Sequence, residues 1–248
     1  MRCIKFLFIG LLIIGIYSCE KSDESNNYYS NVMEINLPTD SPRGLAFDGK
    51  YLWYSDDSLG CLYKISENGD ILTTIQMPGC RLTGFDFNDG CIWCINDTTV
   101  GYETVTEAHY PLSCIYKLSL SGEKLDSILM YTSDSPRPIF LGMTMTDSTI
   151  YGTTNQGWSS QLYKIDPKNQ KRTLLKFCYF NGLTIKNDTL YAIDIQHIYK
   201  TRIAPLGPDY NIILERTTEI DFRATDLAFV SNDLWVCDRE EKKLKRIK

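Results

Sequence analysis

Five stretches of this sequence begin with the same pattern: a glycine or aspartate, followed by three residues that are mostly apolar. The copies are Gly44–Phe47, Gly84–Phe87, Gly142–Met145, Gly182–Ile185 and Asp226–Phe229. An aromatic residue stands nine positions after the first residue of each copy, at Trp53, Trp93, Tyr151, Tyr191 and Trp235. Self-similarity at roughly 40 residues is typical of supersecondary units that bury their faces against one another. The repeat therefore constrains the fold more than any other feature.

Each repeat divides into four short strands. In the first repeat the expected strands are Gly44–Asp48, Tyr51–Ser55, Cys61–Ser66 and Ile71–Met77. The third strand recurs with a Tyr-Lys pair at Leu62–Ile65, Ile115–Leu118, Leu162–Ile165 and Ile198–Thr201. The 16 tyrosines and four tryptophans of the chain also favour strands. The pattern predicts an all-β, five-bladed β-propeller with four-stranded blades.

The fifth repeat ends after its third strand, and a matching strand lies near the start of the chain. Val32–Pro38 has the pattern of Leu72–Pro78, the fourth strand of the first repeat. We expect this N-terminal strand to complete the last blade, because ring closure leaves only short sheet edges exposed. The propeller then occupies residues 31–248. Two alternatives are a β-sandwich of ten or more strands and an additional degenerate blade within residues 97–140.

The first 30 residues are expected to lie outside the propeller. Arg2 and Lys5 precede an apolar run, Phe6–Ile16, that is too short to span a bilayer comfortably. The run ends in Ile-Tyr-Ser-Cys19, which resembles the lipobox of bacterial lipoproteins. This resemblance implies a signal peptide at residues 1–18, a lipidated Cys19, a polar tether at residues 19–30, and a bacterial outer membrane lipoprotein facing the periplasm or the surface. The alternative is an ordinary secretory signal.

The charge of the chain excludes bulk nucleic-acid binding. The formal net charge is −5, and it becomes −7 without residues 1–18, which carry Arg2, Lys5 and no acidic residue. The only expected membrane contact is the lipid anchor. The sequence contains two histidines and none of the common nucleophile, zinc-protease, phosphate-loop or calcium-loop motifs. We therefore expect no catalytic residue, no metal site and no cofactor from the motifs.

Arginines precede several of the first strands of the repeats. Arg43, Arg137 and Arg223 are expected to converge on an anionic ligand at one mouth of the channel, because guanidinium groups bind carboxylates and phosphates. In the alternative interpretation each arginine pairs with an aspartate of a neighbouring blade, for example Arg43 with Asp238. The ends of the second strands carry Asp56, Asn96, Thr154, Asp194 and Asp238. These side chains could cap turns or form a ring of ligands for a cation or sugar, and we favour turn capping.

The second repeat contains a long insertion between Asn96 and Cys114. Long loops on a rigid scaffold often carry recognition. Tyr102, His109 and Tyr110 of this insertion, together with Trp158 of the third repeat, are therefore candidate ligand contacts at the channel mouth. The alternative is a hairpin that packs on its neighbour.

The string Gly-Leu-Ala-Phe-Asp-Gly at 44–49, with Leu-Trp-Tyr-Ser-Asp at 52–56 and Leu-Tyr-Lys-Ile at 62–65, resembles the blades of NHL-type and lactonase-like propellers. The five-blade count also resembles the glutamine cyclotransferase family. The lactonase resemblance implies a calcium ion in the channel, for which Asn181 and Asp226 are the matching positions. The cyclotransferase resemblance implies Gln and Glu before the first strands, where this chain has Arg43 and Thr83.

Together these features favour a membrane-anchored binding protein of the cell envelope. A small ligand or protein partner would bind at the channel mouth without covalent chemistry. The alternatives are an enzyme of the cyclotransferase, lactonase or glycan-hydrolase type, and a pure interaction scaffold.

Overall fold

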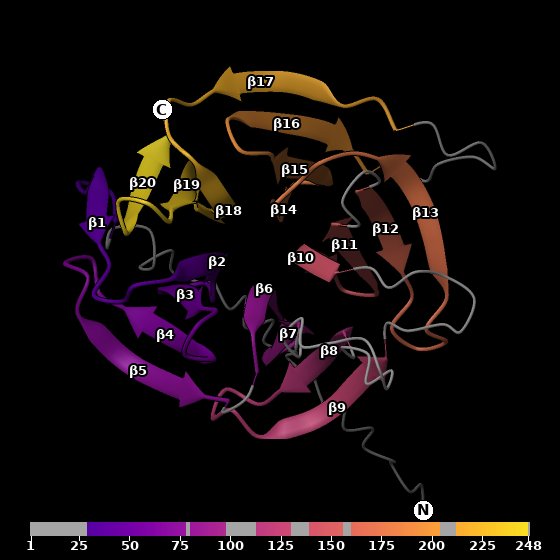
Figure 1. Ribbon diagram of the computed structural model, residues 1–248, viewed down its shortest axis with the longest axis horizontal. Helices are drawn as coiled ribbons and strands as arrows, with labels where there is room; N and C mark the ends of the chain where they lie inside the picture. The colour runs from indigo at the N-terminus through magenta and orange to yellow at the C-terminus, as the bar shows by residue number, and fades with distance from the viewer. Residues whose placement is uncertain are drawn as a thin grey trace, which may run out of the picture.

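The chain folds into a ring of five β-sheets around a central axis (Figure 1). The computed structural model describes residues 29–77, 80–97, 113–129, 139–155, 160–203 and 212–247. Every regular element in these ranges is a β-strand, and each sheet has four antiparallel strands. These sheets confirm the predicted five-bladed propeller. No helix in the described ranges is long and apolar enough to cross a membrane.

The strands of each blade are as follows. Blade 1 consists of β2 (Pro42–Phe47), β3 (Leu52–Asp56), β4 (Cys61–Ile65) and β5 (Ile71–Gln76). Blade 2 consists of β6 (Leu82–Asn88), β7 (Cys91–Asp97), β8 (Ser113–Leu118) and β9 (Lys124–Leu129). Blade 3 consists of β10 (Ile139–Thr146), β11 (Thr149–Asn155), β12 (Gln161–Ile165) and β13 (Arg172–Phe177). Blade 4 consists of β14 (Gly182–Lys186), β15 (Thr189–Ile193), β16 (His197–Arg202) and β17 (Glu215–Glu219). Blade 5 consists of β18 (Ala224–Val230), β19 (Asp233–Asp238), β20 (Lys243–Ile247) and β1 (Glu34–Asn36).

The first strand of every blade lies next to the axis, and the fourth strand forms the outer rim (Figure 1). Because the strands are antiparallel, the start of the first strand meets the end of the second. In blade 1 Pro42 pairs with Asp56, and in blade 5 Ala224 pairs with Asp238. These chain positions form one mouth of the channel, as expected from the sequence.

A separate apolar core fills each blade interface among the described residues. The core between blades 1 and 2, for example, combines Trp53 and Leu62 of blade 1 with Phe85 and Ile92 of blade 2. Second strands are buried on both faces, since all five residues of β3 are buried. This double burial explains why aliphatic and aromatic residues follow one another there without a strict polar alternation.

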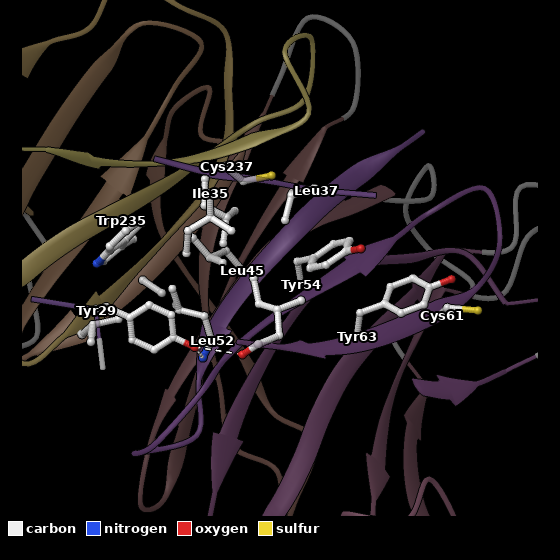
Figure 2. Packing of buried hydrophobic residues seen from close by; sticks show 14 residues of the cluster. Tyr29, Ile35, Leu37, Leu45, Leu52, Tyr54, Cys61, Tyr63, Trp235 and Cys237 are labelled. Carbon is white, nitrogen blue, oxygen red and sulfur yellow. Dashed lines mark hydrogen bonds between the residues drawn. The ribbon is translucent and has the colours of Figure 1, made fainter. Parts of the chain in front are cut away.

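The N-terminal strand closes the ring by completing blade 5. Ile35 of β1 pairs with Leu244 of β20 in antiparallel register, which confirms the predicted closure. Just before this strand, the buried ring of Tyr29 packs edge-on against Trp235 at 5.9 Å (Figure 2). The Tyr29 hydroxyl donates to the Ile65 carbonyl at 2.9 Å and accepts the Leu52 N–H at 3.0 Å. One side chain therefore ties the start of the described chain to blades 1 and 5.

The glycines that open the repeats allow the first strands to approach each other closely at the axis. A Cβ atom on Gly84 would lie 2.9 Å from the Gly142 Cα, and one on Gly142 would lie 2.7 Å from the Gly182 Cα. Real Cβ atoms do not approach other atoms so closely, so these positions require glycine. In blade 5 the equivalent residue is Asp226, whose carboxylate lies against Gly182.

Candidate functional site

A cavity of about 460 Å³ opens at the mouth where first strands begin and second strands end. It lies among blades 1, 4 and 5 and is lined by Asp40, Asn181, Ile195, Arg223, Ala224, Thr225, Arg239 and Glu240. Two of the residues predicted from the sequence, Asn181 and Arg223, are therefore brought together here. The volume falls in the range typical of small-molecule sites.

Beside this cavity, three arginines surround the carboxylate of Asp57. Arg239 of blade 5 donates to both oxygens of Asp57, each at 3.1 Å. Arg43 donates to Oδ2 at 2.9 Å, and the Arg81 Nη2 lies 3.5 Å from the same oxygen. We call Arg43, Arg81, Arg239 and Asp57 the arginine cluster.

The arginine cluster carries more positive than negative charge. The Asp57 side chain is 2% exposed, whereas the Arg43, Arg239 and Arg81 side chains are 19, 34 and 42% exposed. Burial lowers the pKa of Arg43, and the adjacent Asp57 opposes that shift. Arginine stays protonated in proteins, so three guanidinium groups share one buried carboxylate.

Backbone geometry turns Arg43 toward this cluster. The register of β2 against β3 shifts between Pro42 and Leu45, so Arg43 lies in a local bulge at the start of the strand. Bulges re-aim side chains at strand ends. The Thr225 hydroxyl, which lines the cavity, donates to the Arg43 carbonyl at 2.8 Å and holds this segment against blade 5.

The remaining charges of the cavity wall are paired. Arg223 lies 3.1 Å from Glu240, and both side chains are more than half exposed. Asp40 lies 2.5 Å from the Lys242 ammonium group. Arg223 therefore contributes to the cavity as a member of an exposed ion pair, and such pairs exchange partners at little cost.

Two of the polar residues at the ends of the second strands, Asp56 and Asp238, cap turns. Asp56 Oδ1 accepts the backbone N–H groups of Ser58 and Leu59, and Asp238 Oδ1 accepts those of Glu240 and Glu241. Burial works against ionisation of Asp56, but hydrogen bonds from Ser58, Ser41 and Leu59 outweigh it and lower the Asp56 pKa. These contacts support the turn-capping interpretation of this set.

In blade 4, Asp194 caps a turn in the same way. Its Oδ1 accepts the Gln196 and His197 backbone N–H groups, and its Oδ2 lies 3.2 Å from the His197 Nδ1 and accepts the Tyr199 hydroxyl at 3.0 Å. Burial raises the Asp194 pKa, but these hydrogen bonds lower it further than burial raises it.

The alternative pairing expected for Arg43 is not the one observed. Arg43 bonds Asp57 of its own blade, while Asp238 of the neighbouring blade lies 2.7 Å from the Lys245 ammonium group. Cross-blade pairs are instead made with Asp57 by Arg239 of blade 5 and by Arg81, which immediately precedes the first strand of blade 2.

Asp226, one of the two positions implied for calcium, is held by backbone groups of three blades. Its carboxylate accepts the N–H groups of Leu45 at 2.8 Å and Leu227 at 2.9 Å, and it is also hydrogen-bonded by the Leu183 backbone. Burial raises the pKa of Asp226 well above its usual value. The described residues contain no group of three His, Cys, Asp or Glu side chains that fits a metal ion. A carboxylate occupied by N–H donors does not fit the implied calcium site.

The other implied calcium position, Asn181, donates through its side-chain amide to the Ala224 carbonyl at 3.2 Å. Five predicted contact residues lie outside the described ranges: Tyr102, His109, Tyr110, Arg137 and Trp158.

Sequence reasoning missed Asp57 and Arg239, although a signal was present. Both residues immediately follow the aspartate that ends the second strand, Asp56 in blade 1 and Asp238 in blade 5. Opposite charges at one repeat position in adjacent blades of a closed ring indicate a cross-blade pair.

No protein-family model and no curated protein matches this sequence. The fold is similar to solved propellers. The glutaminyl cyclase of Myxococcus xanthus has a TM-score of 0.60 and 12% identity, over 88% of this chain and 94% of that chain. The gluconolactonase of Xanthomonas campestris has a TM-score of 0.54 and 12% identity, over 86% and 88%. A chain of a nidogen–laminin complex has a TM-score of 0.55 and 16% identity, over 79% and 72%. These likenesses show a β-propeller fold and nothing beyond the fold.

Proposed function

We propose that this propeller binds a small anionic molecule, carrying a carboxylate or phosphate group, at the channel mouth. The observation that carries the proposal is the arginine cluster, in which three guanidinium groups share the single carboxylate of Asp57 beside a cavity of about 460 Å³. Arg239 is the member of the cluster that lines the cavity, so an anion bound beside it would lie next to guanidinium groups that outnumber their shared carboxylate.

The donor geometry supports the same ligand class. A guanidinium group has five N–H donors in a planar fork, and carboxylates and phosphates accept such donors in pairs. Arg239 uses two of its donors on Asp57, and Arg43 uses one. Among the described residues, further donors of these two groups remain for a ligand, and Arg223 and Asn181 also line the cavity.

The proposal includes the location expected from the sequence. A lipid on Cys19 would anchor the propeller to the bacterial outer membrane and leave the ring in the periplasm or at the surface. Arg137, Tyr102, His109, Tyr110 and Trp158 remain proposed additional contacts, and neither a cofactor nor a nucleic acid is part of the proposed activity.

An enzymatic function is the second candidate, because two similar structures are named as a glutaminyl cyclase and a gluconolactonase. Such chemistry needs an acid–base group, and Asp226 is a buried carboxyl group with a raised pKa. Its oxygens, however, accept backbone N–H groups from three blades. Turnover of N-terminal-glutamine peptides and sugar lactones tests this alternative directly. A pure scaffold, the third possibility, binds neither anions nor these substrates.

A thermal-shift screen with phosphate, citrate, sugar acids and short dicarboxylates tests the proposed binding. A ligand at 100 times its dissociation constant stabilises the folded state by about 2.7 kcal/mol. We expect one anion class to raise Tm in the wild type and to lose that effect in Arg239→Ala. Arg216→Ala is the matched control, because Arg216 lies on the outer strand β17 in an exposed pair with Glu219. Equal shifts in both variants would contradict the proposed site.

A further inference from the structure

The opposite end of the channel contains a second cavity. Its volume is about 180 Å³, roughly that of six water molecules at about 30 Å³ each. The first strands of all five blades line it, at positions beyond the glycines that pack at the axis. Asp226, which lines neither cavity, lies between the two ends of the channel at 1% exposure.

One carboxylate, that of Asp86, lines this second cavity. Asp86 Oδ2 accepts the Thr144 hydroxyl at 2.7 Å and the Met145 N–H at 3.0 Å. Its Oδ1 accepts only the adjacent Phe87 N–H, at 2.8 Å, among the described residues. A carboxylate oxygen can accept two hydrogen bonds, so Oδ1 retains capacity for one more donor.

This carboxylate has no cationic partner in the described part of the chain. None of the ion pairs formed there involves Asp86 or Asp226, and the negative charge of Asp86 acts on Asp226 through the channel. The nearby Lys186 ammonium group is engaged by the Ser231 carbonyl and the Asn232 side chain. Asp86 is half-buried, and the loss of solvent around its carboxylate raises its pKa, so a cationic ligand would stabilise the ionised form.

The wall around Asp86 favours an organic cation over a metal ion. Phe47, Phe87 and Phe229 stand at the same repeat position in blades 1, 2 and 5 and line the cavity. Aromatic rings attract ammonium groups, and Phe229 already has the Lys186 Nζ 4.8 Å from its ring centroid. The described residues offer no group of three His, Cys, Asp or Glu side chains, which disfavours a zinc ion.

We propose that this second cavity binds a small alkylammonium group, with Asp86 as the anionic acceptor and three phenylalanines among the residues that line it. The site is distinct from the anion site at the other mouth and does not depend on it. The cavity volume limits the bound group to a primary amine with a short alkyl chain.

Calorimetric titration of the protein with ethylammonium chloride tests the proposal. Ethanol serves as the neutral control of similar size, and sodium chloride controls for ionic strength. We expect saturable binding of ethylammonium alone, weakened about tenfold or more in Asp86→Asn, because hydrogen bonds between charged groups are the stronger kind. Arg239→Ala, at the other end of the channel, is expected to leave ethylammonium binding unchanged and thus separates the two sites.

A second variant keeps the proposal testable if Asp86→Asn fails to fold. Phe229→Leu removes an aromatic wall while keeping an apolar side chain, and we expect it to weaken ethylammonium binding several-fold. Three results would overturn the proposal: no saturable binding of ethylammonium, equal binding of ethanol, or Asp86-dependent binding of calcium chloride in place of the amine.

Discussion

At the scale of single residues, two buried carboxylates of the ring are stabilised by different partners. Asp57 contacts three guanidinium groups at the channel mouth, whereas Asp226 contacts backbone N–H groups at the axis. Full charges offset the desolvation of Asp57. Neutral donors offset that of Asp226 only in part, and its pKa is raised as a result.

Replacing Asp57 by asparagine is expected to destabilise the protein by about 2 kcal/mol. Breaking a buried ion pair costs about 3–5 kcal/mol, and the partial exposure of the three arginines reduces that cost. Phosphate should recover part of the loss, because an external anion then replaces the missing carboxylate among the guanidinium groups. Urea unfolding of Asp57→Asn with and without phosphate measures both effects. A variant that phosphate stabilises no more than the wild type would count against anion binding by the cluster.

The raised pKa of Asp226 predicts a characteristic pH dependence. Between the unfolded-state pKa near 3.9 and the higher folded-state pKa, the folded protein binds more protons than the unfolded chain. The contribution of Asp226 to the free energy of unfolding therefore falls as pH rises through that window. The difference in unfolding free energy between wild type and Asp226→Asn, measured from pH 4 upward, should show this decline. A difference that does not change with pH would contradict the assigned state of Asp226.

At the scale of strands, close packing at the axis depends on the glycine that opens four of the five repeats. A Cβ on Gly182 would lie 2.5 Å from the Asp226 Cα, which is backbone and cannot move aside. A Cβ on Gly152 of β11 would instead meet the Phe140 ring at 3.1 Å and the Ile165 side chain at 3.6 Å. The two positions thus differ in whether the neighbouring atoms can adjust.

Alanine substitutions at these two glycines are expected to differ sharply. Gly182→Ala should destabilise by more than about 3 kcal/mol, because two first strands would have to separate. Gly152→Ala should cost about 1 kcal/mol or less, because a ring rotation relieves the contact. Thermal unfolding of the two variants side by side provides the comparison. Equal destabilisation would show that axis packing does not set the requirement for glycine.

At the scale of the whole molecule, the ring is held closed by β1, which comes from the opposite end of the chain from its partner β20. Ile35 of β1 is 2% exposed within the core between blades 5 and 1 (Figure 2). Ile71, on the equivalent outer strand of blade 1, is 41% exposed. Closure therefore buries the Ile35 side chain in addition to pairing the two strands.

Truncating these two isoleucines tests the closure. Ile35→Ala should lower the free energy of unfolding by about 2–5 kcal/mol, the usual cost of emptying a buried isoleucine site. Ile71→Ala should change it by less than about 0.5 kcal/mol. Denaturant unfolding of the two variants is the measurement, and similar small effects in both would contradict a closing role for β1.

The fold was predictable from the sequence because the repeat occurs in phase five times. The predicted first strand Gly44–Asp48 matches β2 to within two residues, and the displaced end strand Val32–Pro38 contains β1. The residues that repeat are those that pack between neighbouring blades, and this packing determines the ring architecture.

The site was predictable only in part, because side-chain partners across a closed ring are not neighbours in the chain. Arg223 was placed at the mouth by its position before a first strand, whereas Asn181 was placed in the channel by the lactonase resemblance. The pair of Asp57 with Arg239 was not predicted, since these two residues are 182 positions apart in the chain. Asp226 lies at the axis, at the repeat position that glycine occupies in the other four blades. Its expected role as a calcium ligand came from the lactonase resemblance alone.

Calorimetric binding of the best anion from the screen is the most direct test of the arginine cluster as a ligand site. The titration would compare wild type with Arg43→Ala, Arg239→Ala and the outer-strand control Arg216→Ala. We expect the two cluster variants to weaken binding by about tenfold or more each, since charged hydrogen bonds contribute about 1.5–3 kcal/mol. Arg216→Ala should bind as the wild type does. Unchanged affinity in both cluster variants, with folding intact, would contradict the proposed function.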